Sequence, residues 1–297
     1  MSLSRWRDTG SRFDFQGHSI FYHRHGAGSA ALLLIHGFPT SSWDWEPVWP
    51  GLCAQFQHVV APDLLGFGFS ARPPGHRYSL MEQADLCEAL LAACGVTDVH
   101  LLAHDYGDSV AQELLARHRE RLGQGLRIGS AVLLNGGLFP ETHRATGTQK
   151  LMKSPLGPIA AWLMSERSFG KSFARVFGPE TRPSRIELHD FWRLVSENDG
   201  RRAMPRLLRY IDERRKHRER WVDALIHARV PLRLINGPED PVSGAHMAER
   251  YRELMPDADI VSLPGIGHYP QFEAPDRTLR AFLDFHRKRV APGVPAG

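Results

Sequence analysis

Six short apolar runs limit what this chain can fold into more than any other feature of the sequence. They are Ala31–Ile35, His58–Ala61, Val99–Ala103, Ala131–Leu134, Leu232–Ile235 and Ile260–Leu263, and Gly, Asn, Asp or Pro follows each within two residues. Brief runs of this kind are typical of strands buried on both faces. Amphipathic segments separate them at 79–94, 109–118 and 245–254. The alternation predicts an α/β fold with a mostly parallel central sheet flanked by helices.

Two regions depart from this alternation. Arg12–Phe15 and Ser19–His23 have the pattern of an antiparallel hairpin, which we place at the sheet edge. Residues 139–228 carry helical patterns and no clear strand. This predicts an α-helical cap, 139–228, inserted into a core of residues 1–138 and 229–297. An insertion at the carboxyl end of a parallel sheet covers the crevice where ligands bind.

Charge and cysteine content argue against several classes of protein. The net charge of +4 comes mostly from arginines spread along the chain, so we expect no nucleic-acid partner. The densest run, 214–220, is interpreted as a solvated helix face. Cys53, Cys87 and Cys94 form no disulfide framework. The N-terminus lacks the apolar stretch of a signal peptide, and no run reaches the roughly 20 apolar residues of a membrane span. These features predict a cytoplasmic protein.

The segment 101–108 carries the clearest chemical signal, because a strand there passes directly into a helix. Ala103 and Gly107 lie two positions on either side of Asp105. Small residues at this spacing permit a turn so sharp that the central side chain projects above the sheet as a nucleophile. The turn also places Asp105 at the positive end of a helix. The alternative is that Asp105 serves only as a helix N-cap.

Loops after other strands supply candidate partners. Backbone N–H groups of Phe38 and Tyr106 are placed to form an oxyanion hole. Asp240, in the turn after 232–235, is the candidate orienting acid. His268, flanked by glycine after the last strand, is the candidate base. His36, and the loop 63–70, are interpreted as scaffold.

These motifs give the sequence a family resemblance over nearly its whole length. It resembles the α/β-hydrolase superfamily, and within it the branch of epoxide hydrolases and haloalkane dehalogenases. More closely, it resembles the mesoderm-specific transcript proteins. This resemblance lies in residues 101–115, 135–144, 176–184, 198–200 and 207–225 and in GPEDPV and GHYPQFE. The resemblance implies an α/β-hydrolase fold with an Asp nucleophile.

An aspartate is ionised at pH 7 and needs no base to attack a saturated carbon. His268, oriented by Asp240, would then activate a water that hydrolyses the alkyl ester of Asp105. The substrate is expected to be small and apolar, with water as co-substrate and no cofactor or metal.

The leaving group separates two reactions. Related dehalogenases usually carry Trp after the nucleophile and often Asn in the first loop, where this chain has Tyr106 and Phe38. Related epoxide hydrolases use cap tyrosines, which points to Tyr210, with His143 and His189 open as a second acid. The sequence therefore predicts epoxide hydrolysis, with haloalkane dehalogenation as the alternative. A lipid- or metabolite-binding module with a relict triad is the alternative of another class.

Overall fold

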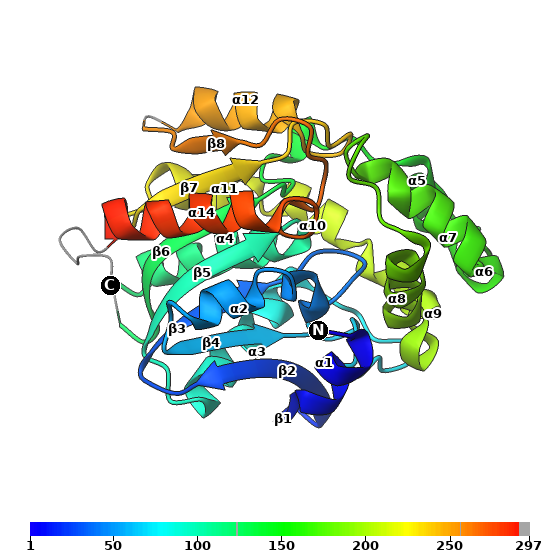
Figure 1. Ribbon diagram of the computed structural model, residues 1–297, viewed down its shortest axis with the longest axis horizontal. Helices are drawn as coiled ribbons and strands as arrows, with labels where there is room; N and C mark the ends of the chain where they lie inside the picture. Colours follow the sequence, from blue (N-terminus) through cyan, green and yellow to red (C-terminus); the bar gives the residue numbers. More distant parts are fainter. Residues whose placement is uncertain (123, 256, 291–297) are drawn as a thin grey trace.

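The computed structural model describes residues 1–122, 124–255 and 257–290. Within these residues, eight strands form one sheet in the order β1-β2-β4-β3-β5-β6-β7-β8 (Figure 1). Their bounds are β1 Ser11–Phe15, β2 His18–Gly26, β3 Ala30–Ile35, β4 His58–Pro62, β5 Asp98–His104, β6 Arg127–Leu134, β7 Leu232–Asn236 and β8 Ile260–Ser262. β2 is antiparallel to both β1 and β4, and the remaining pairs are parallel. The predicted hairpin and mostly parallel sheet are confirmed.

Helices cover both faces of the sheet. The helices of the described residues, including those that lie beyond the sheet, are α1 Leu3–Thr9, α2 Trp49–Cys53, α3 Leu80–Ala93, α4 Tyr106–Glu120, α5 Gly147–Lys153, α6 Gly157–Leu163, α7 Glu166–Phe173, α8 Arg185–Ser196, α9 Gly200–Leu207, α10 Tyr210–Lys216, α11 Arg218–Ile226, α12 Ala245–Leu254, α13 Pro270–Glu273 and α14 Pro275–Phe285. The predicted helices correspond to α3, α4 and α12. Ser79 begins α3, because its side chain accepts from the Glu82 N–H.

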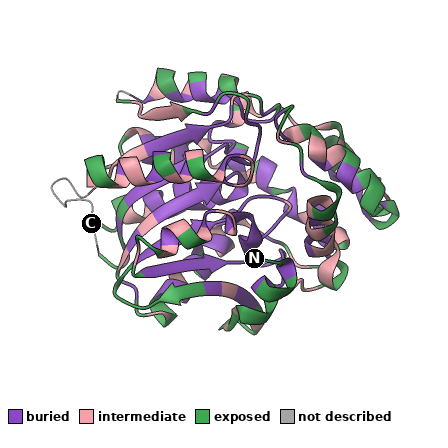
Figure 2. Cartoon of the chain, in the orientation of Figure 1, coloured by how far each residue is buried: buried purple, intermediate pink, exposed green. Residues whose placement is uncertain are grey.

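The apolar runs are continuous because each central strand is buried on both sides. In β3, Leu33 and Ile35 face the core shared with α3 and α4, whereas Leu32 and Leu34 face the core shared with α14. Figure 2 shows the central strands buried along most of their length. Cys87 is buried inside α3, and all three cysteines are free.

Every regular element between β6 and β7 is a helix, from α5 to α11 with short 3-10 turns, as the pattern predicted. Figure 1 shows α5 to α9 grouped beyond the carboxyl ends of the parallel strands. His268 N–H donates to the Val176 carbonyl at 2.8 Å, so this segment contacts the loop after β8. Among the described residues, no helix is both long and apolar enough to span a membrane.

Candidate functional site

Asp105 occupies the sharp turn between β5 and α4. Its φ of 47° and ψ of −101° lie in a region that non-glycine residues rarely adopt. Its side chain makes no capping hydrogen bond to the helix, which removes the N-cap interpretation. A side chain at Gly107 could not fit, because its Cβ would lie 2.2 Å from the Ile35 carbonyl oxygen. The fold therefore holds this strained turn against β3.

The two oxygens of the Asp105 carboxylate have different surroundings. Oδ2 accepts the Phe38 N–H at 3.1 Å and lies 3.9 Å from His268 Nε2, beyond hydrogen-bond reach. Oδ1 lies 3.3 Å from Arg214 Nη2. Burial alone would raise the pKa of Asp105, but His268 and Arg214 hold it well below its usual range. The carboxylate is therefore ionised although it is buried.

The Phe38 loop is held by its neighbours. His36 Nδ1 donates to the Gly37 carbonyl at 2.8 Å, and Nε2 accepts the Leu64 N–H at 3.0 Å. Both ring nitrogens are thus occupied, and burial lowers the His36 pKa to about 4. These contacts agree with the predicted scaffold role. Tyr106 directly follows Asp105, and its ring is buried with the Phe67 ring 5.2 Å away between centroids.

His268 and Asp240 form a short pair across two loops. His268 Nδ1 donates to Asp240 Oδ2 at 2.7 Å. Burial alone would lower the pKa of His268, but Asp240 and Asp105 raise it to about 10. Burial would raise the pKa of Asp240, but His268 lowers it below its usual value. In the resting site both carboxylates are charged, and the imidazole carries a second proton.

Further residues hold this pair, and the sequence interpretation did not single them out. Asn135 follows β6, and its Nδ2 donates to Asp240 Oδ2 at 3.0 Å. Ser243 donates to the same oxygen through its Oγ at 2.8 Å. His104 Nε2 donates to the His268 carbonyl at 2.7 Å. The position of Asn135 directly after a strand could have marked it as a site residue. The sequence could not show its partner, Asp240, which lies 105 residues away.

Arg214 corrects the interpretation of the run 214–220 as a solvated helix face. Its side chain is 2% exposed and lies against Asp105. One face of α10 turns inward, because Tyr210, Ile211 and Arg214 share helical spacing and are buried. Arg215 remains exposed, as expected for the opposite face.

The candidate cap acids lie in three different places. Tyr210 is buried, and its hydroxyl accepts from Gln149 Nε2 at 3.4 Å. The Arg214 guanidinium lies 4.5 Å from the centre of the Tyr210 ring. His189 lies at the surface and contacts Glu166 at 2.9 Å. Both ring nitrogens of His143 are buried without a hydrogen-bond partner in the described part of the chain.

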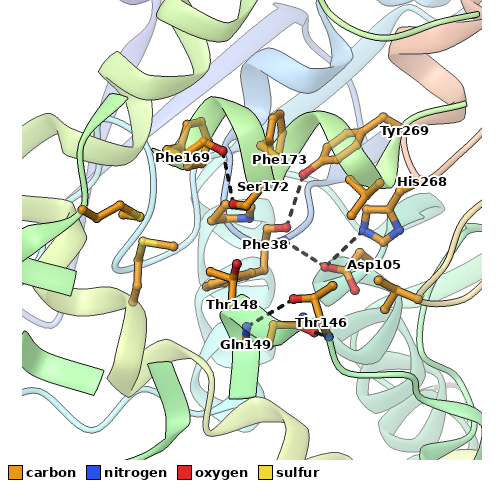
Figure 3. A pocket seen from close by; sticks show the side chains of 15 residues that line it. Phe38, Asp105, Thr146, Thr148, Gln149, Phe169, Ser172, Phe173, His268 and Tyr269 are labelled. Carbon is orange, nitrogen blue, oxygen red and sulfur yellow. Dashed lines mark hydrogen bonds and ion pairs between the residues drawn. The ribbon is translucent and has the colours of Figure 1, made fainter. Parts of the chain in front are cut away.

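A cavity lies above Asp105 (Figure 3). It encloses about 630 Å³, open mouth included, between the sheet and α5, α7 and their flanking loops. Its lining consists of Phe38, Pro39, Asp105, Thr146, Thr148, Gln149, Met164, Phe169, Ser172, Phe173, Val176, Met204, Val242, His268 and Tyr269. Its lining is thus largely apolar, with a few polar groups.

Tyr269, which the sequence interpretation missed, lines the cavity, whereas Tyr210 does not. Its hydroxyl donates to the Phe38 carbonyl at 3.3 Å, and Figure 3 shows it directed toward Phe38. Burial raises the pKa of Tyr269 well above its ordinary value, so the hydroxyl keeps its proton. Over the described residues, no group of three or more His, Cys, Asp and Glu side chains could hold a metal ion.

Comparison with known proteins agrees with this fold. Residues 32–281 match the Alpha/beta hydrolase family. The chain belongs to this family. It is 45% identical over 293 residues to the mesoderm-specific transcript homolog protein of Homo sapiens, a match covering 96% of this chain and 88% of that protein.

Solved structures of two enzyme types share the fold of this hydrolase. The haloalkane dehalogenase DatA from Agrobacterium tumefaciens superposes with a TM-score of 0.78 at 20% identity, covering 95% of this chain and 97% of that one. The epoxide hydrolase CorEH superposes with a TM-score of 0.73 at 20% identity, covering 94% and 98%. Identities this low establish the fold, and the reaction must be argued from the site.

Proposed function

We propose that this hydrolase opens epoxides to diols through an alkyl ester on Asp105. One observation carries the proposal: a buried, ionised carboxylate projects from the turn into an apolar cavity. Oδ2 of this carboxylate already accepts the Phe38 N–H. A carboxylate bound in this way presents its other oxygen, Oδ1, for attack on a saturated carbon.

The reaction then takes two steps. Oδ1 attacks an epoxide carbon, the C–O bond breaks, and the freed oxygen takes a proton. In the second step His268, held by Asp240, takes a proton from a water that attacks Cγ of the ester. Phe38 N–H stabilises the oxyanion on Oδ2, with Tyr106 N–H as the proposed second donor.

The charge state of His268 fits this sequence of events. The resting imidazole is protonated because Asp240 and Asp105 raise its pKa. Esterification removes the Asp105 charge, which lowers that pKa and lets His268 act as a base. Opening an epoxide consumes a proton, which the hydroxyl of Tyr269 gives in this proposal. The protonated imidazole then returns a proton to Tyr269 and becomes neutral, whereas release of a halide would not use this proton.

The acid that protonates the epoxide oxygen is assigned to Tyr269 in this proposal. Its hydroxyl is protonated and belongs to the cavity lining. Tyr210, the acid predicted from the sequence, reaches the cavity only through Gln149. We therefore give Tyr210 a packing role.

Residues 139–228 are proposed to act as a cap over a core of residues 1–138 and 229–297. The cavity supports this division, because its floor comes from the core and most of its apolar wall from the helical segment. This segment would then select the substrate. Its Phe169, Phe173 and Met164 favour an apolar substituent on the epoxide.

Haloalkane dehalogenation is the second candidate. The carboxylate and the apolar cavity suit it equally. A leaving halide requires N–H donors in the cavity, and neither Trp nor Asn appears among the described residues that line it. A binding module with a relict triad is disfavoured, because the Asp240–His268–Asp105 arrangement retains its charges and its order.

The test is intact-protein mass spectrometry of His268→Gln incubated with styrene oxide, 1,2-epoxyhexane and 1-bromohexane. The first step does not need His268 but the second does, so an ester should accumulate. A mass increase equal to the whole epoxide, located on Asp105, is the expected result. The double variant Asp105→Asn/His268→Gln is the control and should stay unlabelled.

An adduct of the hexyl group alone would indicate a dehalogenase. If the folded His268→Gln variant acquires no adduct from any of the three compounds, the nucleophile assignment is wrong.

A further inference from the structure

Arg214 makes contacts that a simple ion pair does not require. Its Nε donates to Ser109 Oγ at 2.7 Å, and its Nη2 donates to the Asp105 carbonyl oxygen at 2.8 Å. The contact with the Asp105 carboxylate is longer, 3.3 Å from Nη2 to Oδ1. Nη1 is buried without a hydrogen-bond partner among the described residues.

The two shortest contacts go to neutral acceptors that chemistry at the carboxylate leaves unchanged. Charge-assisted hydrogen bonds to a carboxylate are usually about 2.7–2.9 Å and often bidentate. Here the backbone carbonyl and Ser109 fix the guanidinium, and the carboxylate makes the weaker contact. Arg214 should therefore stay in place when Asp105 becomes an uncharged ester.

The carboxylate geometry shows which oxygen the guanidinium faces. Oδ2 lies at the Phe38 N–H, where the oxyanion of a tetrahedral intermediate develops. Oδ1 is then the oxygen that carries the alkyl group, and it is the oxygen nearest Arg214 Nη2. An alkyl-enzyme would leave a fixed cation beside its ester oxygen.

We propose that Arg214 is a catalytic residue for the breakdown of the alkyl-enzyme, where it stabilises the charge that develops on Oδ1 as the product alcohol departs. The inference rests on the proposed function of Asp105. It adds a role for a cap residue that differs from those of the base and the oxyanion hole.

The step balances without another reactant. Water oxygen bonds to Cγ while His268 Nε2 takes one water proton, and the negative charge moves to Oδ2. When the intermediate collapses, the Cγ–Oδ1 bond breaks and Oδ1 leaves with the alkyl carbon. Oδ1 then receives the proton from His268. The acid left on Cγ, which contains the water oxygen, gives its remaining proton to His268, so Asp105 regains its carboxylate and the imidazole its second proton. Arg214 Nη2–H donates to Oδ1 throughout.

The contact between Arg214 Nη2 and Asp105 Oδ1 should slow the first step, formation of the ester. In the resting enzyme the cation stabilises the charge on Oδ1, and this lowers its reactivity toward a carbon electrophile. Removing the guanidinium should thus affect the two steps in opposite directions. A purely structural arginine would have no such effect.

The experiment compares ester formation and ester hydrolysis in single turnovers with styrene oxide and 1,2-epoxyhexane. Quenched samples of wild type, Arg214→Met, Arg214→Lys and Arg220→Met are analysed by intact-protein mass spectrometry. Arg220 is the control, because it is another arginine from the same segment, is paired with the buried carboxylate of Glu113 at 2.8 Å and is not in contact with Asp105. Thermal unfolding of each variant verifies that it is folded.

We expect Arg214→Met to slow ester hydrolysis by about 10²–10³-fold, the usual effect of losing one oxyanion donor. Ester formation should accelerate, so the alkyl-enzyme accumulates although His268 is intact. Arg214→Lys should restore part of the hydrolysis rate, and Arg220→Met should resemble wild type.

Equal slowing of both steps in Arg214→Met, or hydrolysis at the wild-type rate, overturns the role of Arg214 while leaving the nucleophile assignment intact. If Arg214→Met does not fold, Arg214→Lys tests the role of Arg214. The lysine ammonium would lie farther from Oδ1 than the guanidinium does, so the fraction of alkyl-enzyme should still rise above that of the wild type. If His268→Gln gives no adduct, the proposed function and this inference both fail.

Discussion

Replacing Asn135 by alanine should destabilise the protein by roughly 2–5 kcal/mol, although the residue lies outside the proposed reacting groups. Its Oδ1 accepts the buried Gly237 N–H at 2.7 Å. Its Nδ2 donates to Asp240 Oδ2 at 3.0 Å, and its φ is 42°. The side chain therefore connects the end of β6 to the turn that carries Asp240.

The magnitude follows from two losses. The Gly237 N–H would be left buried without an acceptor, which costs about 1–3 kcal/mol. Alanine also adopts a left-handed backbone less readily than asparagine, which adds about 1–2 kcal/mol. Asp240 would lose one donor but keep its bonds from Val242 and Ser243. The pair with His268 should therefore survive in the folded variant.

The free energy of unfolding should be measured in urea by tryptophan fluorescence. Asn236→Ala is the matched control. Asn236 is buried one strand away, and its side chain donates a hydrogen bond to the Ser243 carbonyl at 3.1 Å. We expect a shift in the midpoint with an unchanged m-value. A loss below about 1 kcal/mol, or no greater than that of Asn236→Ala, would refute the reasoning.

Three further predictions concern the same site. Gly107→Ala should destabilise the fold by about 1–3 kcal/mol or more and abolish ester formation, because the added Cβ meets main chain that cannot move aside. Urea unfolding and intact-protein mass spectrometry of the ester test this, and a variant that is both stable and reactive would contradict it. Tyr269→Phe should slow epoxide opening more than Tyr210→Phe, as single-turnover rates would show, and the reverse order would restore Tyr210 as the acid. The pKa of His268 is about 10 in the folded protein, against 6.5 ordinarily. This raised pKa stabilises the folded state fully below about pH 6.5, and the stabilisation is lost as the pH rises through 10. Unfolding free energies between pH 6.5 and 10 should therefore fall, and should fall less in Asp105→Asn; an equal slope in both proteins would contradict the assigned cause.

The residues around Asp105 illustrate what could be predicted locally. Ala103 and Gly107 lie within two residues of it, and the turn that they permit is formed by adjacent backbone. The continuous apolar runs also predict buried parallel strands without knowledge of their neighbours, because a strand covered on both faces needs apolar residues at every position. The fold class, the hairpin and the helical stretch between β6 and β7 depend on such local patterns, and all three were predicted.

Arg214 illustrates what a local pattern could not give. In the sequence it belongs to a run of charges, which is usually solvated, and the helical period alone does not say which face of α10 turns toward the core. The packing of Tyr210 and Ile211 orients the helix, and their partners come from distant parts of the chain. The same holds for Tyr269, which lines the cavity instead of Tyr210. The sequence by itself thus determined the strands, the sharp turn and the types of side chain that we propose to react. The tertiary structure decided which buried charge faces each oxygen of Asp105, since that depends on contacts between residues about a hundred positions apart.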